Sequence, residues 1–250
     1  RARLVVNGTS GHGSVPRTDN AIVHLAGAVA ILGAWQTPMR LNDTTRTYFE
    51  RLAAISPPEQ AARYSGLTDP EQSEAIQRYL AEHEPPHYSM LRTSVVPTIL
   101  SGGFRMNVIP SEAEATLDIR VAPGEDVDAL FAEMQTLIGD PAVRIERSSE
   151  GLRPPTEPSG LDNDMFRALE TVTQRLYPGS TTLPTMLTGA TDMAFLRARG
   201  IQSYGIGPAS TADDRTNYGA HSDVERLRES SLYDFMRFTW EVVMEVAATR

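Results

Sequence analysis

The chain has 250 residues, with 32 acidic and 23 basic side chains, a formal net charge of −9 at pH 7 and a pI of about 5.1. This acidic balance excludes an electrostatic nucleic-acid binder, and no apolar run reaches the roughly 18 residues of a membrane span, so we expect a soluble globular protein, cytoplasmic or exported, without nucleic-acid or membrane partners. Cysteine and lysine are both absent, which excludes disulfides, cysteine-ligated zinc and lysine Schiff-base chemistry.

The N-terminal segment predicts a strand, a glycine-rich loop and a helix. Residues 4–6 are a short apolar run, and the loop of residues 8–16 that follows contains His12. Thr18 and Asp19 are cap candidates for the next segment, in which apolar residues recur at helical spacing. This apolar stripe consists of Ile22, Leu25, Ala26, Val29 and Leu32. We expect the helix to pack against a sheet through that stripe.

A polar insertion and two strands come next along the chain. Proline pairs and a glycine divide the polar residues 43–90 into short predicted helices. Residues 92–110 then have the composition of a strand. In residues 112–121 polar and apolar side chains alternate with a period of two, which predicts a strand with one buried face. Arg120 must therefore lie on the polar face of that strand.

A helix and a strand complete the first predicted domain. Residues 127–138 carry an apolar helical stripe that ends at Gly139, and residues 143–146 form the last strand. The order of strand, helix, insertion, two strands, helix and strand is the βαββαβ pattern of a ferredoxin-like sandwich. We therefore assign residues 1–150 to one domain.

The second predicted domain follows a linker. Prolines and glycines gather in residues 148–160, so we place the boundary there and assign residues 151–250 to the second domain. Its predicted elements are a helix at 165–176, a strand at 182–187, a helix at 191–199, a strand at 201–206 and a helix at 232–246. Two strands make a thin sheet, so we expect this α/β domain to need strands that the chain does not contain.

Three sequence patterns resemble catalytic motifs but give weak predictions. The string HEPPH at residues 83–87 spells the zincin signature, yet its two prolines disfavour the helix that must place both imidazoles on one face. Ser14 beside His12 suggests a nucleophile and base, but the loop lacks the strand-turn-helix elbow of a serine hydrolase. Gly205 and Gly207 lack the third glycine of a dinucleotide fingerprint.

The histidines divide into one helical residue and two loop residues of interest. His24 lies beside apolar residues on its predicted helix, where we expect it to be packed or at the rim of the core. His12 and His221 lie in loops, flanked by glycine and polar residues, where a side chain can face a cleft. These two are therefore the candidate functional histidines.

Four segments in order along the chain carry a resemblance to a known family. They are GHGSVP at 11–16, GFRMNVIP at 103–110 continuing to DIR at 118–120, TGATD at 188–192, and GAHSDVER at 219–226. Together they resemble the two-zinc exopeptidases and amidohydrolases that include aminoacylase, carboxypeptidase S-like and glutamate carboxypeptidases, and succinyl-diaminopimelate desuccinylase. The resemblance implies an α/β (α+β) architecture, in which a ferredoxin-like lid that forms a homodimer precedes the C-terminal portion of an α/β zinc-exopeptidase catalytic domain.

The same resemblance implies a function and a role for each matching residue. The implied activity is zinc-dependent hydrolysis of an amide bond in a small peptide or an N-acyl amino acid, as in a metallopeptidase or aminoacylase. His12 matches the catalytic lid histidine that stabilises the oxyanion in the partner subunit's site. Asn107 and Arg120 match residues that hold substrate oxygens, and His221 matches the last metal ligand. We expect Asp192 to be a carboxylate that supports the metal site without binding the metal.

The chain also departs from the family pattern. The other zinc ligands and the general base of this family precede the lid, and none is in this sequence. We expect two zinc ions, or other divalent metals, in the parent enzyme and none bound stably by this chain, because a catalytic zinc needs about three protein ligands. The chain begins at Arg1 without methionine, so we expect an inactive fragment of a longer enzyme. Ala194 stands where many relatives have a carboxylate-binding arginine, which predicts altered carboxylate recognition there.

Two other interpretations stay open. The chain could be a non-catalytic dimerisation or ligand-binding module, in which the ferredoxin-like sandwich performs the function. It could also be a degenerate relative that binds ligands without turnover, a reading that Ala194 weakly supports. The exact substrate, the metal and the compartment do not follow from the sequence.

Overall fold

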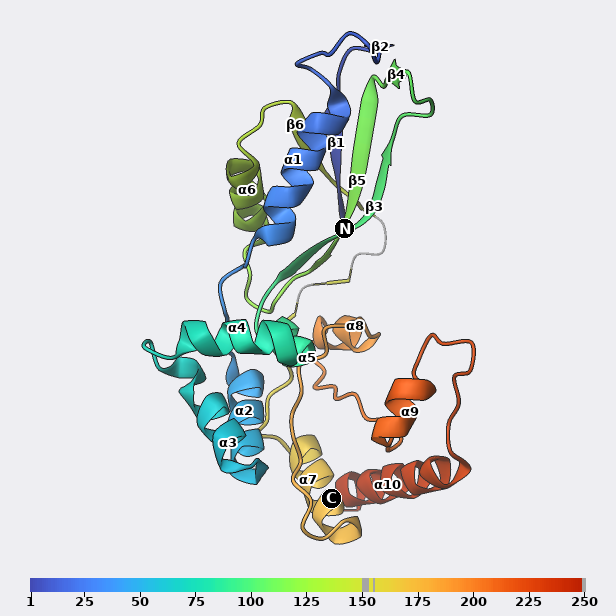
Figure 1. Cartoon of the computed structure of the whole chain (residues 1–250). Coiled ribbons are helices and arrows are strands. Elements are labelled where there is room, and N and C mark those ends of the chain that lie inside the picture. Colours follow the sequence, from blue (N-terminus) through green and yellow to red (C-terminus); the bar gives the residue numbers. More distant parts are fainter. Residues whose placement is uncertain (150–152, 155, 249–250) are drawn as a thin grey trace. The chain divides into compact units, whose positions relative to one another are not determined.

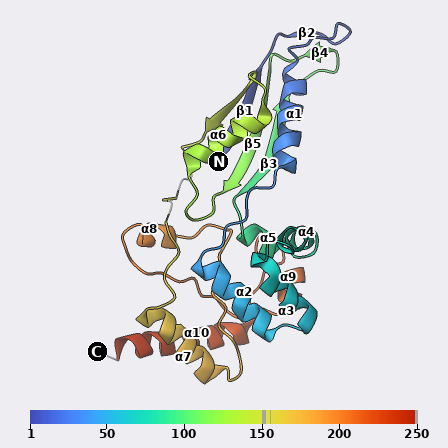
Figure 2. The same cartoon turned by 90° about the vertical axis from the view of Figure 1, so that its left-hand side faces the viewer.

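A computed structural model describes residues 1–149, 153–154 and 156–248 of the chain (Figures 1 and 2). The chain forms two compact units whose segments alternate along the sequence. The first comprises Arg1–Asn42, Pro70–Glu157 and Leu187–Ala190, and the second comprises Asp43–Asp69, Pro158–Met186 and Thr191–Arg250. The predicted insertion is thus divided between the units, and the predicted boundary near residue 150 stays a prediction. Within the described ranges, no helix combines the length and apolar character needed to cross a bilayer.

A four-stranded antiparallel sheet forms the centre of the first unit. Its strands are β1 (Ala2–Asn7), β3 (Ser94–Gly102), β5 (Glu112–Arg120) and β6 (Val143–Arg147), in the spatial order β3-β5-β1-β6. Helices α1 (Ala21–Ala34) and α6 (Val127–Ile138) lie side by side over one face of the sheet (Figures 1 and 2). This is the strand order of a βαββαβ sandwich, and it confirms the predicted mixed α/β fold class.

The alternation in β5 sets the position of the core. Ala113, Ala115 and Leu117 are buried, while the polar residues between them stay partly exposed. Each of the three pairs with a buried residue of β1 in the antiparallel register. These partners are Val6, Leu4 and Ala2, respectively. The polar face of β5, including Arg120, therefore lies on the side of the sheet opposite the core.

Helix α1 differs from its prediction in both its cap and its buried face. Asn20 is the N-cap, and its side chain accepts a hydrogen bond from the N–H of Ile22. The predicted cap, Asp19, is not available for this role because its side chain accepts from Arg17 and from the N–H of Thr9. The residues that face the core are Ala21, Leu25, Ala28 and Leu32, whereas Ile22 is exposed. Alanines on this face let the helix approach the sheet closely, and the helix is too uniformly apolar for its sequence to select one face.

The insertion consists of short helices separated where the prolines and glycine predict. They are α2 (Asp43–Ile55), α3 (Pro58–Ser65), the 3-10 turn η1 (Gly66–Thr68), α4 (Ser73–His83) and α5 (Pro85–Met90). Glu84 lies between α4 and α5 with non-helical φ −134° and ψ 55°. The continuous helix of a zincin site is therefore absent at residues 83–87, because two prolines start a new helix there.

The second unit contains four further helices in its C-terminal part. They are α7 (Asp164–Leu176), α8 (Met193–Arg197), α9 (Ala212–Asn217) and α10 (Glu229–Ala247). Phe166, Leu169 and Val172 of α7 form a small core with Val242 of α10. The strands predicted at 182–187 and 201–206 are wrong, since both segments are irregular. A strand needs a hydrogen-bonded neighbouring strand, and no strand occurs among the described residues of the second unit.

Candidate active site

Two loops meet at one end of the sheet and bring His12 close to Asn107. The two-stranded ladder of β2 (Gly11–His12) and β4 (Val108–Ile109) joins them, and His12 lies opposite Val108 (Figure 1). The N–H of Gly13 donates to the carbonyl of Asn107 at 2.8 Å. We call residues 8–16 and 103–110 the tip. The structure thus places two of the predicted site residues, both exposed, on adjoining turns of the tip.

Hydrogen bonding within the tip determines which ring nitrogen of His12 is a donor. The N–H of Ser14 donates to His12 Nδ1 at 3.2 Å, and Ser14 Oγ lies 2.7 Å from the same nitrogen. A main-chain N–H can only donate, so Nδ1 is the acceptor and the proton of the neutral ring lies on Nε2. His12 therefore presents an exposed N–H donor at Nε2, which is the group an oxyanion contact requires.

The contact between Ser14 and His12 also bears on the serine-hydrolase interpretation. The two side chains are within hydrogen-bond reach, as a nucleophile and its base must be. No carboxylate contacts the other ring nitrogen among the described residues, so the group that orients the base in a triad is missing. The contact between Ser14 and His12 therefore orients the imidazole within the tip, and it does not amount to a catalytic triad.

The base of the His12 loop is held by Asp19. Arg17 Nε donates to Asp19 Oδ1 at 2.8 Å, and the N–H of Thr9 donates to Oδ2 at 3.2 Å. These bonds, led by the one from Arg17, hold the pKa of the Asp19 carboxyl well below its usual range. At Gly8 a Cβ would lie 2.1 Å from the carbonyl oxygen of Asp19, so only glycine fits this close approach.

Arg120 lies at the other end of the same sheet. It is the last residue of β5, opposite Ser94 of β3, whereas the tip adjoins the first residue of β5, Glu112. A strand of nine residues spans about 27 Å between its terminal residues. Arg120 Nε lies 2.7 Å from Asp118 Oδ1, and Nη2 donates to Asp118 Oδ2 at 2.8 Å. The structure therefore separates Arg120 from His12 and pairs it with a carboxylate that the sequence reasoning overlooked.

His221 lies in the second unit, in a loop with an unusual backbone. It has φ 68°, and among the described residues other than glycine it alone has a positive φ. Its N–H donates to Glu225 Oε2 at 2.9 Å, while its imidazole is exposed. A Cβ at Gly219 would lie 2.7 Å from the carbonyl oxygen of Arg215, so the chain must be glycine there. These contacts fix a backbone that a histidine rarely adopts.

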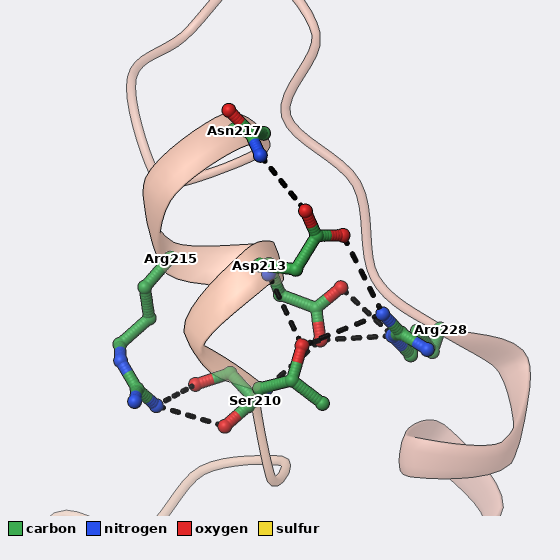
Figure 3. A network of polar contacts seen from close by, with 7 residues as sticks. Ser210, Asp213, Arg215, Asn217 and Arg228 are labelled. Atoms are coloured by element: carbon green, nitrogen blue, oxygen red, sulfur yellow. Dashed lines mark hydrogen bonds and ion pairs between the residues drawn. The ribbon is translucent and has the colours of Figure 1, made fainter.

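A polar network anchors both ends of the His221 loop (Figure 3). Asp214 of α9 accepts from the N–H and hydroxyl of Thr211 at 2.9 and 2.8 Å, which completes a capping box. Arg228, the N-cap residue that precedes α10, donates through Nε to both oxygens of Asp214 at 2.8 Å. The bonds from Thr211 and Arg228 lower the pKa of Asp214 to about 2. Both ends of the loop are thus tied together.

The remaining candidates lie around α8. Asp192 precedes this helix, is exposed and makes no side-chain capping bond. Ala194, in contrast, is buried within the helix. No contact joins Asp192 to His221 among the described residues, and no three His, Asp or Glu side chains there come together as a metal site. The residues present supply one imidazole and do not complete a metal site.

Two partner residues had a signal in the sequence that was not used. Asp118 and Arg120 are two apart on a strand, so their side chains share one face and can pair. Glu225 follows His221 by four residues, a distance that a tight turn can close. Neither spacing is specific enough to identify the pair without the fold.

Comparison with known proteins gives consistent matches. Residues 1–146 match the family model of the M20 peptidase dimerisation domain. The chain is 31% identical to the human N-fatty-acyl-amino acid synthase/hydrolase PM20D1 over 77% of this chain and 38% of that protein. It is 31% identical to human aminoacylase-1 over 55% of this chain and 33% of that protein. A carboxypeptidase S-like protein of Dictyostelium discoideum is 30% identical over 76% of this chain and 36% of its own length.

Solved structures agree with the fold. A metallo-carboxypeptidase of the M20 family, Sso-CP2 from Sulfolobus solfataricus, matches 98% of this chain and 57% of its own with a TM-score of 0.64 at 17% identity. The di-peptidase Dug1p from Saccharomyces cerevisiae matches 99% of this chain and 54% of its own with a TM-score of 0.57 at 17% identity. The chain thus spans 33–38% of the curated relatives above and a little over half of these two structures.

Proposed function

The chain belongs to the M20 peptidase family, whose dimerisation domain it contains in residues 1–146, and on this premise we propose that it is the lid and part of the catalytic domain of an amide-bond hydrolase. The proposed substrates are small peptides or N-acyl amino acids, in agreement with the names of its relatives. The observation that carries the proposal is the tip, where an exposed His12 donor adjoins Asn107. The proposed whole enzyme is longer than this chain.

His12 and Asn107 act on the carbonyl group of the substrate. As a nucleophile adds to the amide carbon, negative charge develops on the carbonyl oxygen. The Nε2–H of His12 donates to that oxygen, and Ser14 keeps the ring in the tautomer that can do so. The side-chain amide of Asn107 holds a second substrate oxygen beside it. This arrangement stabilises the intermediate without any proton transfer by His12.

Arg120 binds the substrate carboxylate at a place that its own tip cannot reach. The carbonyl and carboxylate of one small substrate are a few ångströms apart, whereas β5 separates the tip from Arg120 by about 27 Å. One lid therefore cannot deliver both groups to the same substrate. A homodimer can, because a two-fold axis brings the tip of one subunit near the Arg120 end of the other. Each proposed site thus takes His12 and Asn107 from one subunit and Arg120 from the other.

The surface that fits this homodimer is the free edge of β3 and the adjoining face of α1. β3 is one of the two edge strands of the sheet, the other being β6, and it exposes Val96, Ile99 and Leu100. Ile22 and Val23 of α1 are exposed as well. An unpaired strand edge with apolar side chains favours pairing with a second copy of itself.

M20 peptidases are metal-dependent, and we propose that His221 is a metal ligand of the whole enzyme, with Asp192 as a supporting carboxylate. The exposed ring of His221 has the donor chemistry for zinc, although other divalent ions also bind imidazole. We propose that its further ligands come from residues outside this chain, a proposal that agrees with the lack of a three-ligand cluster among the described residues. For that reason we assign no chemical step to a metal. We propose that this chain has no hydrolytic activity by itself.

Two inactive variants of the whole enzyme test the shared site. We expect His12→Ala and Arg120→Gln each to lower kcat/KM by about 100-fold or more. Mixing the two restores activity, because one site of each hybrid dimer receives His12 from one subunit and Arg120 from the other. With random exchange half of the dimers are hybrids with one working site, so activity returns to about a quarter of wild type.

The same experiment has a clear negative outcome. If both residues serve a site within one subunit, every site of a hybrid carries one of the two substitutions and no activity returns. Subunit exchange is verified with two affinity tags purified in sequence, so absence of mixing is not mistaken for absence of recovery. A variant of His83, which lies outside the tip, should keep wild-type activity and serves as the control for an unrelated histidine substitution.

A further inference from the structure

The ion pair between Arg120 and Asp118 has a geometry that bears on substrate recognition. Two close contacts join the side chains: Nη2 donates a hydrogen bond to Oδ2 at 2.8 Å, and Nε lies 2.7 Å from Oδ1. Both residues are partly exposed, so the pair adds little to stability. Its two-point geometry nevertheless fixes the plane of the guanidinium, as fork-like pairing does.

A guanidinium has two edges that can each bind a carboxylate at two points. Arginine carries five N–H donors; Asp118 accepts one from Nη2, and its other oxygen lies 2.7 Å from Nε, so this side edge of the guanidinium faces Asp118. Both donors of Nη1 and one of Nη2 remain, and together they form the end of the fork. No other carboxylate forms an ion pair with Arg120 among the described residues. The other ion pairs on this face join Arg3 to Glu114 and Glu146, and Arg144 to Glu146.

The strand segment that carries the pair is held by β3. Ser94 and Val96 of β3 pair with Arg120 and Asp118, respectively, whereas the pairing of β5 with β1 ends at Leu117. Asp118 and Arg120 are two residues apart, so both project from the polar face of β5. The carboxylate is therefore a fixed reference for the guanidinium and does not depend on a mobile loop.

We propose that Asp118 is a positioning residue for Arg120, holding the side edge of the guanidinium so that its end binds a planar carboxylate of the substrate at two points. This inference rests on the proposed function, in which Arg120 binds the substrate carboxylate, and it deepens that function by naming the residue that orients Arg120. The substrate class is then an amide compound with a free carboxylate, such as an N-acyl amino acid, and a neutral amide at that position binds more weakly. Carboxylate recognition is thereby assigned to the lid, although Ala194 occupies the usual arginine position.

The test is a kinetic assay of the proposed whole enzyme with two substrates, N-acetyl-L-methionine and its C-terminal amide. These substrates differ only in the group that Arg120 is proposed to recognise. We expect Asp118→Asn to raise KM for the free acid about tenfold, with kcat unchanged and KM for the amide unchanged. Asp118→Glu should restore part of the loss, because it keeps a carboxylate that can reach the same edge. Glu114→Gln removes one charge from the same face of the same strand without touching Arg120 and serves as the matched control.

A spectroscopic readout separates orientation from catalysis. In the wild type the Nη2–H of Arg120, which donates to Asp118, should give a protected, slowly exchanging NMR signal, and Asp118→Asn should abolish that protection. Two results would contradict the inference. Asp118→Asn could leave the ratio of KM for the acid to KM for the amide at its wild-type value, or it could lower KM for the acid, which would mean that Asp118 competes with the substrate for Arg120. Failure of the proposed function looks different, since Arg120→Gln itself then leaves the acid-to-amide preference intact.

Discussion

At the scale of single residues, His24 shows how a histidine can be structural and still sensitive to pH. Its Nδ1 lies 2.5 Å from Asp140 Oδ2, and its Nε2 lies 3.0 Å from the carbonyl oxygen of Thr18. Both partners are acceptors, so both ring nitrogens donate and the imidazole is charged. The hydrogen bond to Asp140 is the main cause of its raised pKa, and the pKa of Asp140 is lowered chiefly by the same bond. His24 thereby links α1 to the turn after α6.

This pair predicts a pH-dependent stability of the first unit. Because the pKa of His24 is higher in the folded state than the unfolded value of about 6.5, its contribution is fully present below that value and is lost as pH rises through the folded pKa. We expect His24→Gln to lower the free energy of unfolding at pH 6 and to have a much smaller effect at pH 9, measured by urea titration. His83→Gln is the control, and an equal loss at both pH values would contradict the prediction.

The individual site residues could be named from sequence, but their mutual positions could not. The loop context singled out His12, the alternation placed Arg120 on a polar face, and the family resemblance supplied the role predicted for each residue; these roles stay predictions. Their separation by the length of β5 follows from the strand register, which pairs residues far apart in the chain. Asp118 was overlooked for the same reason, since an i, i+2 pair matters only once the segment is known to be a strand.

At the scale of elements, two glycines in helices should respond to alanine with opposite signs. Gly139 ends α6 with φ 62°, a left-handed conformation that costs a residue with a Cβ about 1 kcal/mol. Gly27 lies within α1, where an added Cβ meets nothing within 4 Å. We therefore expect Gly139→Ala to lower the free energy of unfolding and Gly27→Ala to raise it, each by about 1 kcal/mol. Denaturant titration of both variants checks the signs, and a gain at Gly139 would contradict the assigned cap.

The elements that sequence predicted well are those with a single strong local cause. The period of β5, the cap at Gly139 and the proline breaks of the insertion each depend on residues close in sequence. The predicted face of α1 was only partly right: Leu25 and Leu32 are buried, but Ile22 and Ala26 are exposed. Nearly every side of that helix is apolar, so only the sheet decides which side is covered. The strands at 182–187 and 201–206 failed because pairing, not composition, makes a strand.

At the scale of the whole molecule, the free edge of β3 should decide the oligomeric state. Ile99 is exposed on this edge, and a lysine there is a common natural means of preventing edge pairing. We expect Ile99→Lys to convert the proposed dimer into monomers, as measured by sedimentation velocity. Leu137→Lys introduces the same charge at an exposed apolar position of α6 and should leave the dimer intact. A dimer that survives Ile99→Lys would place the interface elsewhere.

Dissociation of this dimer has a consequence for catalysis that distinguishes a shared site from a site within one subunit. If each site needs His12 from one subunit and Arg120 from the other, a monomer has no complete site, whatever its fold. Ile99→Lys should therefore lose activity in the longer protein at low concentration and regain it, per chain, as concentration restores the dimer. Wild-type protein should keep constant specific activity over the same range, because its dimer stays assembled. Full activity of Ile99→Lys monomers would show that one subunit completes its own site. Because β5 separates His12 from Arg120 by its full length, that result would mean that the two residues do not act together on one small substrate.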